Sequence, residues 1–412
     1  MSLQGAILMN LASPIEPPER IATIDILRGI ALFIVLAINT ATEFRVSIFE
    51  QFLPGKTSAR IVAEISEALV VALHTKGFIL FSFLFGVGLA IQFGRLADNP
   101  RRLTLMLRRL AVLLAFGVTH LFLIWNGDIL TEYAIVGFAV LPFLYGPRWL
   151  LAVIAAPSLG VYIAMPLLPP VVSLPSNRWI IQHVAEAQQV YGSGGFLDIL
   201  AFRVDEVRSI APLHVYALPR TFGLFLLGAL AWRTDVFRPA SFDQRSRAAA
   251  ACLMIALGGW MTVTATTGDV FGSHLNWQGR AMLQSLAQLA LAAGYGAGIV
   301  LLTNRPVGRK VVGWAGPVGR MAFTNYIAQS LILSGIFYGF GLALFGRLSV
   351  LQSLVVAIVI YAVQAAFSAW WLGRFRFGPI EWLWRSLMYG ERQRLSRPPM
   401  PAANLVNPAG VA

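Results

Sequence analysis

The sequence predicts an all-α, polytopic integral membrane protein with about ten transmembrane helices and both termini in the cytoplasm. Hydrophobic residues make up 57% of its 412 residues and charged residues only 12%, whereas soluble domains are about a quarter charged. The mean hydropathy is +0.69. A water-soluble fold of this length could not bury so much apolar side chain, so the bilayer must be its solvent.

Apolar runs long enough to cross a bilayer recur along the chain. A transmembrane helix needs about 20 mostly apolar residues. Such runs predict helices at 24–43, 70–94, 107–125, 129–146, 149–168, 213–232, 247–266, 281–302, 320–340 and 350–371. They form one transmembrane domain, residues 24–390. A cytoplasmic segment, residues 1–23, precedes it without the basic start of a cleavable signal peptide. The tail, residues 391–412, is rich in proline and alanine, and we expect it to be disordered.

The basic residues predict the orientation. The net charge is +13, and arginines concentrate in the connections 95–109, 233–247 and 305–320 and in the tail after Trp371. With ten helices these stretches share one side, which the positive-inside rule assigns to the cytoplasm. Because the charge lies between apolar runs, we expect no nucleic-acid partner. The longest outer connection, about 169–212, predicts one or two short helices at the membrane interface.

All five histidines fall at outer helix ends or in outer connections under this topology. We interpret His183 and His274 as interfacial side chains bonded to backbone or water, and His214 lies in the same outer region. His74 and His120 differ, because they lie within or against apolar helices, where an unpaired polar group is costly and indicates a function. The single cysteine, Cys252, excludes an intrachain disulfide, and we expect no metal.

The densest group of polar residues is the stretch GVTHLFLIWNGDILTEY at 117–133. His120 precedes a tight turn, and Asp128 and Glu132 follow it at helical spacing. A carboxylate beside an imidazole sets its tautomer, so His120 could act as a general base. The alternative is that Asp128 only caps the next helix, while Trp125 and Tyr133 belong to an interfacial aromatic belt.

The first helix carries a second polar pattern. Asp25 and Arg28 lie one turn apart at its inner end, and Asn39 follows Arg28 by eleven residues, about 16 Å along a helix. The simpler interpretations are a local ion pair at the helix start and, for Asn39, an interhelical hydrogen bond.

The second helix contains a lysine within its apolar span. Lys76 could extend to the outer interface or neutralise a buried acid such as Glu43 or Asp128. Gly86 and Gly88 on the same helix indicate close helix packing.

Three stretches of the sequence resemble the YeiB-like family of bacterial membrane proteins, also called domain of unknown function 418. They are IDILRGIALFIVLAINT at 24–40, the region 83–143 with its string HLFLIWNGDILTEY, and the region 316–390, which ends in GPIEWLWRSLMYG. The resemblance implies a multi-pass protein of the bacterial cytoplasmic (inner) membrane, in contact with membrane lipids.

The YeiB-like family is in turn similar to transmembrane acyltransferases, which include the lysosomal heparan-glucosaminide acetyltransferase. In that group an arginine near the inner end of the first helix is followed eleven residues later by a polar residue implicated in acyl transfer, and Arg28 and Asn39 occupy these positions. The resemblance implies that cytoplasmic acyl-CoA donates its acyl group to a small-molecule, lipid or glycan acceptor at the outer face. The heparan enzyme also has a histidine just after this helix. Residues 40–66 contain none, so His120 or His74 would have to be the base.

We therefore expect a transmembrane acyltransferase in which His120, oriented by Asp128, is the base. Asn39 would stabilise the oxyanion, and Arg28, with Asp25 beside it, would attract the phosphates of CoA. Alternatives are a transporter or exporter of a small hydrophobic or anionic solute, and a non-enzymatic protein that binds lipid or a partner. A cavity joining Arg28 to His120 would favour acyl transfer, and a cavity open to one side would not.

Overall fold

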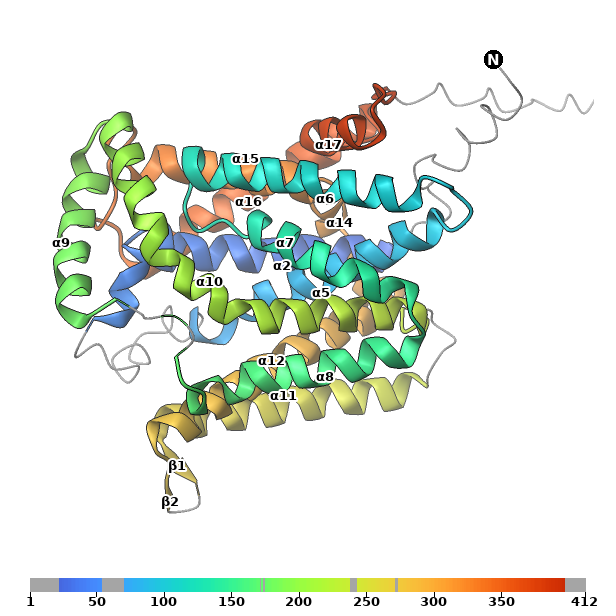
Figure 1. The fold of residues 1–412 in the computed structure, drawn as a ribbon, viewed down its shortest axis with the longest axis horizontal. Coiled ribbons are helices and arrows are strands. Elements are labelled where there is room, and N and C mark those ends of the chain that lie inside the picture. Colours follow the sequence, from blue (N-terminus) through green and yellow to red (C-terminus); the bar gives the residue numbers. More distant parts are fainter. Residues whose placement is uncertain are drawn as a thin grey trace, which may run out of the picture.

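The computed structural model describes residues 22–53, 70–170, 172, 175–237, 243–270 and 273–396. Most of the N-terminal segment 1–23 and residues 397–412 of the tail lie outside this part. The described chain is a bundle of helices whose long axes run in broadly the same direction (Figure 1). Its strands are β1 (Asp269–Val270) and β2 (Ser273–His274), an antiparallel pair between two helices.

The helices follow the expected apolar runs closely. They are α2 (Ala22–Asn39), α5 (Lys76–Arg95), α6 (Arg102–Thr119), α7 (Leu130–Val140), α8 (Arg148–Ala164), α9 (Asn177–Ser193), α10 (Phe196–Arg233), α11 (Gln244–Thr267), α12 (Trp277–Thr303), α13 (Pro306–Val312), α14 (Ala315–Arg320), α15 (Ala322–Phe337), α16 (Val350–Arg374) and α17 (Pro379–Tyr389).

Eight helices in the described ranges are long and apolar enough to cross a membrane, so the chain is an all-α, multi-pass membrane protein. The runs expected at 129–146 and 320–340 form shorter apolar helices, Leu130–Tyr145 and Ala322–Phe337. Both pack largely inside the bundle, where most of their side chains are buried. A helix surrounded by protein need not present a full apolar span to lipid.

Helix α2 is the central element. Of the membrane-spanning helices it has the most buried span, at 72%, and Figure 1 shows it between the neighbouring helices rather than at the edge. Glycines bring α14 against it, because a Cβ at Gly29 would lie 2.1 Å from the Ala315 carbonyl oxygen. Gly86 likewise packs against the Phe225 backbone. Gly88 does not have the expected packing role, because a Cβ there would meet open space.

The outer connection differs from the expectation. Its first helix is α9, but its second half is continuous with the next span, because α10 runs unbroken for 38 residues. We expected this helix to begin at 213, and it begins at Phe196. At 1.5 Å per residue α10 is about 57 Å long, longer than the roughly 30 Å of hydrocarbon in a bilayer. Its first half therefore extends beyond the span, and α9 lies across that end of the bundle (Figure 1).

The first residues of the expected tail fold back on the bundle. Ser396 forms an isolated β-bridge with Phe375, and the Arg376 amide donates to the Leu395 carbonyl. These contacts hold the chain end beside α17.

Candidate functional site

Single π-helical turns end two of the helices that carry the candidate residues. Asn39 is the last residue of α2 and precedes the π turn Thr40–Phe44. His120 opens the π turn His120–Ile124 at the end of α6, where the Trp125 amide donates to the His120 carbonyl at 2.8 Å. Such turns occur frequently at functional sites, and we did not expect them from the sequence.

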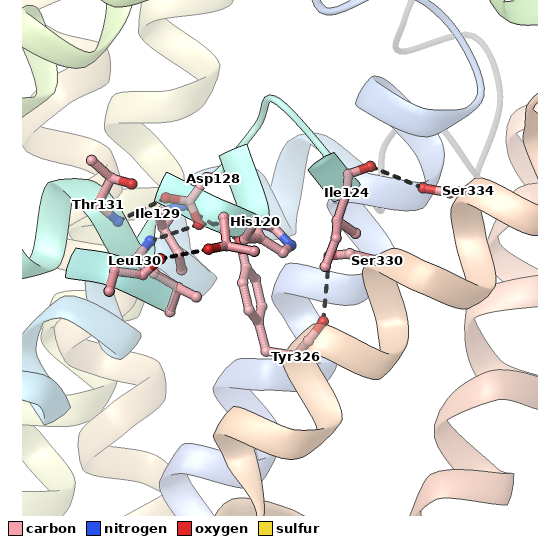
Figure 2. A network of polar contacts seen from close by, with 11 residues as sticks. His120, Ile124, Asp128, Ile129, Leu130, Thr131, Tyr326, Ser330 and Ser334 are labelled. Atoms are coloured by element: carbon pink, nitrogen blue, oxygen red, sulfur yellow. Dashed lines mark hydrogen bonds and ion pairs between the residues drawn. The ribbon is translucent and has the colours of Figure 1, made fainter. Parts of the chain in front are cut away.

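His120 and Asp128 form a buried pair, here called the dyad. His120 Nδ1 lies 2.9 Å from Asp128 Oδ1, and neither side chain is exposed. Asp128 also caps α7, because its carboxylate accepts hydrogen bonds from the amides of Leu130 and Thr131 at 3.1 and 2.7 Å (Figure 2). Asp128 therefore both contacts the imidazole and caps α7, and the role of His120 as a base stays a prediction. Because a carboxylate only accepts hydrogen bonds, Nδ1 is the donor in this contact.

Two buried polar atoms near the ends of α2 and α6 have no hydrogen-bond partner among the described residues, His120 Nε2 and Asn39 Oδ1. His120 is 0% exposed and Asn39 is 4% exposed. Buried polar atoms are nearly always paired, so each exception requires an explanation. No hydrogen bond in the described part of the chain links Asn39 to the dyad.

Aromatic rings enclose the dyad. The ring of Tyr326 lies 5.2 Å from that of His120, and the ring of Trp125 lies 6.2 Å from it. Trp125 also stacks on Phe44 at 4.5 Å. Tyr133 is buried as well and its hydroxyl bonds to Ser82 at 2.8 Å. The aromatic-belt interpretation of Trp125 and Tyr133 is therefore wrong, because both rings are inside the protein.

A second histidine–carboxylate pair lies on α7 and α10. His214 Nδ1 is 3.1 Å from Glu132 Oε2, and the Thr221 hydroxyl donates to the other oxygen of Glu132. Asp128 and Glu43 are close enough to interact electrostatically with His214. The sequence singled out Glu132 but not its partner on α10, because 82 residues separate the two in the chain.

A third pair joins α9 to α10. His183 Nε2 lies 2.7 Å from Glu206 Oε1, and the other oxygen of Glu206 accepts hydrogen bonds from Tyr191 and Asn126. His183 is buried and stacks on Trp179 at 4.2 Å, so its interfacial interpretation is wrong. Burial, together with the adjacent Glu206 carboxylate, raises the pKa of the Tyr191 hydroxyl. Because both oxygens of Glu206 are bonded to side chains of the bundle, we assign this network a structural role.

The structure places His74 and Lys76 away from the dyad's hydrogen bonds. His74 Nδ1 lies 3.0 Å from the hydroxyl of Thr75. Lys76 is 1% exposed and its amine donates to the Val71 carbonyl at 2.8 Å. It forms no ion pair with a described acid and does not reach a surface, so neither expectation for Lys76 holds within the described chain.

A cavity of about 230 Å³ opens between α2, α5, α6, α15 and α17. Four arginines line it: Arg28, Arg109, Arg320 and Arg385. Asp25, another lining residue, pairs with Arg28 at 3.3 Å. The guanidinium of Arg109 lies over the ring of Trp384 at 4.3 Å. We call this part of the bundle the arginine-rich end.

The rest of the cavity is apolar and aromatic. Its lining includes Phe81, Leu84, Phe85, Leu130, Tyr133 and Tyr326. Asn39, His120 and Asp128 do not line it, so the cavity does not join Arg28 to His120, which is the outcome that does not favour acyl transfer. Tyr326 lines the cavity, and its ring also contacts that of His120. No group of three His, Cys, Asp or Glu side chains in the described ranges could hold a metal ion.

Sequence comparisons agree with this architecture. Residues 231–391 match the family described as "Protein of unknown function (DUF418)". The chain is 34% identical to the uncharacterized protein YxaH of Bacillus subtilis (strain 168) over 413 residues, covering 94% of this chain and 99% of YxaH. It is 28% identical to the uncharacterized protein YeiB of Escherichia coli (strain K12), covering 90% of this chain and 96% of YeiB. The YeiB-like resemblance is thereby confirmed, and the chain belongs to the DUF418 family.

Proposed function

We propose that this protein is an acyltransferase of the bacterial cytoplasmic membrane, which moves an acyl group from cytoplasmic acyl-CoA to an acceptor at the outer face. The observation that carries the proposal is the state of His120. Asp128 holds its Nδ1 proton, and its buried Nε2 has no partner among the described residues. An imidazole with one nitrogen bonded to a carboxylate and the other without a partner is the arrangement that a general base requires.

The cavity supports the identity of the donor. Its lining follows α5 from Phe81 to Gln92, about 16 Å of helix axis. The pantetheine arm of CoA has about twelve bonds between phosphate and sulfur. An extended polypeptide with the same number of backbone bonds, about four residues, is about 14 Å long, and the extended arm has a similar length. The volume of about 230 Å³ is below the roughly 300–1,000 Å³ of sites that enclose a whole drug-sized ligand. The cavity therefore fits the arm and leaves the nucleotide at the arginines.

The proposed reaction assigns one step to each of these groups. His120 Nε2 removes the proton of an acceptor hydroxyl or amine, and the acceptor atom attacks the thioester carbonyl. The amide of Asn39 stabilises the oxyanion of the tetrahedral intermediate. The carbon–sulfur bond then breaks, and the imidazolium returns the proton to the leaving thiolate. Arg28 and Arg109 hold the CoA phosphates by charge-assisted hydrogen bonds.

Transfer by single-residue variants tests this assignment in purified protein. His120→Ala should lower transfer about 10²–10⁴-fold, the usual range for a general base, and Asn39→Ala about 10²–10³-fold, as for one oxyanion donor. The fold should persist in His120→Ala, because Asp128 keeps its two amide donors. His274→Ala, at an exposed histidine outside the bundle, is the matched control and should transfer normally.

The second candidate is a transporter or exporter of a small anionic or hydrophobic solute. It is favoured by one observation, that the cavity lining does not include His120. Purified protein that binds no acyl-CoA in a mass-spectrometric screen would exclude the acyltransferase and leave the transporter and the lipid-binding alternatives. Transfer at the wild-type rate by His120→Ala would instead exclude His120 as the base.

A further inference from the structure

Tyr326 belongs to both the cavity and the dyad. Two aromatic rings contact His120, those of Trp125 and Tyr326, and of these only Tyr326 also lines the cavity. Figure 2 shows its side chain extending from α15 to the dyad. A thioester that enters from the arginine-rich end therefore meets the Tyr326 ring before it meets His120.

The backbone around Tyr326 is held firmly, and its ring is held weakly. Asn325 bonds to Ser368 at 3.0 Å, and Gln329 bonds to Gln364 at 2.8 Å, so α15 is tied to α16 on both sides of Tyr326. The Tyr326 hydroxyl accepts one hydrogen bond, from the Ile129 amide at 3.4 Å. This is longer than the roughly 2.7–3.2 Å of an ordinary N–H···O bond. Rotation of the ring therefore breaks only this one long hydrogen bond, and its remaining cost is the packing of a ring that is 2% exposed.

We propose that Tyr326 is a gate between the donor cavity and His120. In the closed position its ring separates His120 from the cytoplasmic cavity and keeps cytoplasmic water from the base. When the ring swings aside, the thioester carbonyl reaches His120 Nε2. The gate prevents hydrolysis, in which water attacks the thioester and releases a carboxylic acid and free CoA thiol. This role rests on the proposed function, although the barrier itself can be tested without catalysis.

Accessibility of a cysteine at the base tests the barrier directly. The protein carries His120→Cys in a Cys252→Ser background, so that position 120 holds its single thiol. Inverted membrane vesicles that contain this protein are treated with a membrane-impermeant thiol reagent, which can reach position 120 only from the cytoplasmic side. Labelling should be slow with Tyr326 present and at least about tenfold faster after Tyr326→Ala, because the closed state is lost. Tyr326→Phe should remain slow, since the ring and not the hydroxyl forms the barrier.

Tyr133→Ala is the matched control. It removes a second tyrosine ring from the same cavity lining, but none of the described ring contacts of Tyr133 is with His120. Labelling should therefore stay slow. Equal labelling rates with and without the Tyr326 ring, or acceleration by Tyr133→Ala as large as that by Tyr326→Ala, would overturn the gate.

The ratio of hydrolysis to transfer tests the consequence for chemistry. Tyr326→Ala should raise thioester hydrolysis relative to transfer, and Tyr326→Phe should restore the wild-type ratio, which a merely structural loss would not do. An unchanged ratio in Tyr326→Ala would overturn the gate. If the wild-type protein does not consume acyl-CoA, the proposed function fails, and the labelling experiment still decides whether Tyr326 closes the cavity.

Discussion

At the scale of single residues, Glu381 explains how α17 is held against the bundle. Its carboxylate accepts hydrogen bonds from the amides of Phe323 and Thr324 at 2.8 and 3.0 Å and from the Thr324 hydroxyl. These amides are at the start of α15, where unpaired N–H groups and the helix dipole favour an anion. Burial nevertheless raises the pKa of Glu381, and the hydrogen bonds from Thr324 and Phe323 offset only part of that rise.

The raised pKa of Glu381 predicts a pH dependence of α17 docking. The docked carboxyl binds a proton more readily than the undocked one, so protonation favours docking. Docking of α17 should be weakest at a pH above the raised pKa of Glu381. It should strengthen as the pH falls from that raised pKa toward the ordinary pKa of a glutamate. Hydrogen exchange of the α17 amides, corrected for intrinsic exchange rates, measures this change. Glu381→Gln should abolish the dependence, and a wild-type protein whose docking strengthens with rising pH would contradict it.

At the scale of elements, α5 shows how one helix both packs and leaves space. Gly86 approaches α10 so closely that a Cβ would lie 2.1 Å from the Phe225 carbonyl oxygen, whereas a Cβ at Gly88 would meet nothing within 4 Å. Gly88 lines the cavity. Its missing side chain therefore leaves room for a ligand, while that of Gly86 allows the helix contact.

This difference predicts the effect of filling the cavity. Gly88→Leu should weaken acyl-CoA binding at least about tenfold, because overpacking a site costs roughly 1–3 kcal/mol. Gly94→Leu, on the same helix and also facing open space but outside the cavity lining, should bind normally. Isothermal titration of each variant with acyl-CoA measures the two affinities. Both variants replace glycine with leucine, so the change in helix propensity is the same in each. Equal binding by both would show that the ligand does not pass Gly88.

At the scale of the whole molecule, the cavity arginines lie at one end of the bundle, and the histidine–carboxylate pairs lie toward the other. Arg28 lies in the first half of α2 and lines the cavity with the other arginines, and Asn39 ends the helix beside the π turn. The three histidine–carboxylate pairs involve the outer connection or the adjoining ends of α6, α7 and α10. The arginine-rich end is the one that the positive-inside rule assigns to the cytoplasm.

That polarity predicts the result of reporter fusions. A reporter active only outside the cytoplasm should be silent when fused near residue 100, where arginines flank the junction, and active near residue 190, in α9. The measurement is reporter activity in whole cells, normalised to the expression of each fusion. The reverse pattern would invert the direction of the proposed transfer.

The sequence predicted the parts of the site that are local in the chain. The pairing of His120 with Asp128 and the cap on α7 both follow from eight residues of spacing across one turn. The partners of Glu132 and Glu206 on α10 and α9 could not be found this way. Their contacts depend on how α10 packs. The first half of α10 contains charged residues and a proline, so in the sequence it resembled a connection rather than a helix.

The sequence by itself determined the fold class, the places of the apolar helices and the family, because transfer of apolar side chains into lipid depends on composition and run length and little on neighbours. Only the tertiary structure decided that Trp125, Tyr133 and His183 are buried, that the cavity does not include His120, and that His120 Nε2 is left without a described partner. Burial and pairing are properties of surfaces that meet from distant parts of the chain, and hydropathy carries no information about which surfaces meet.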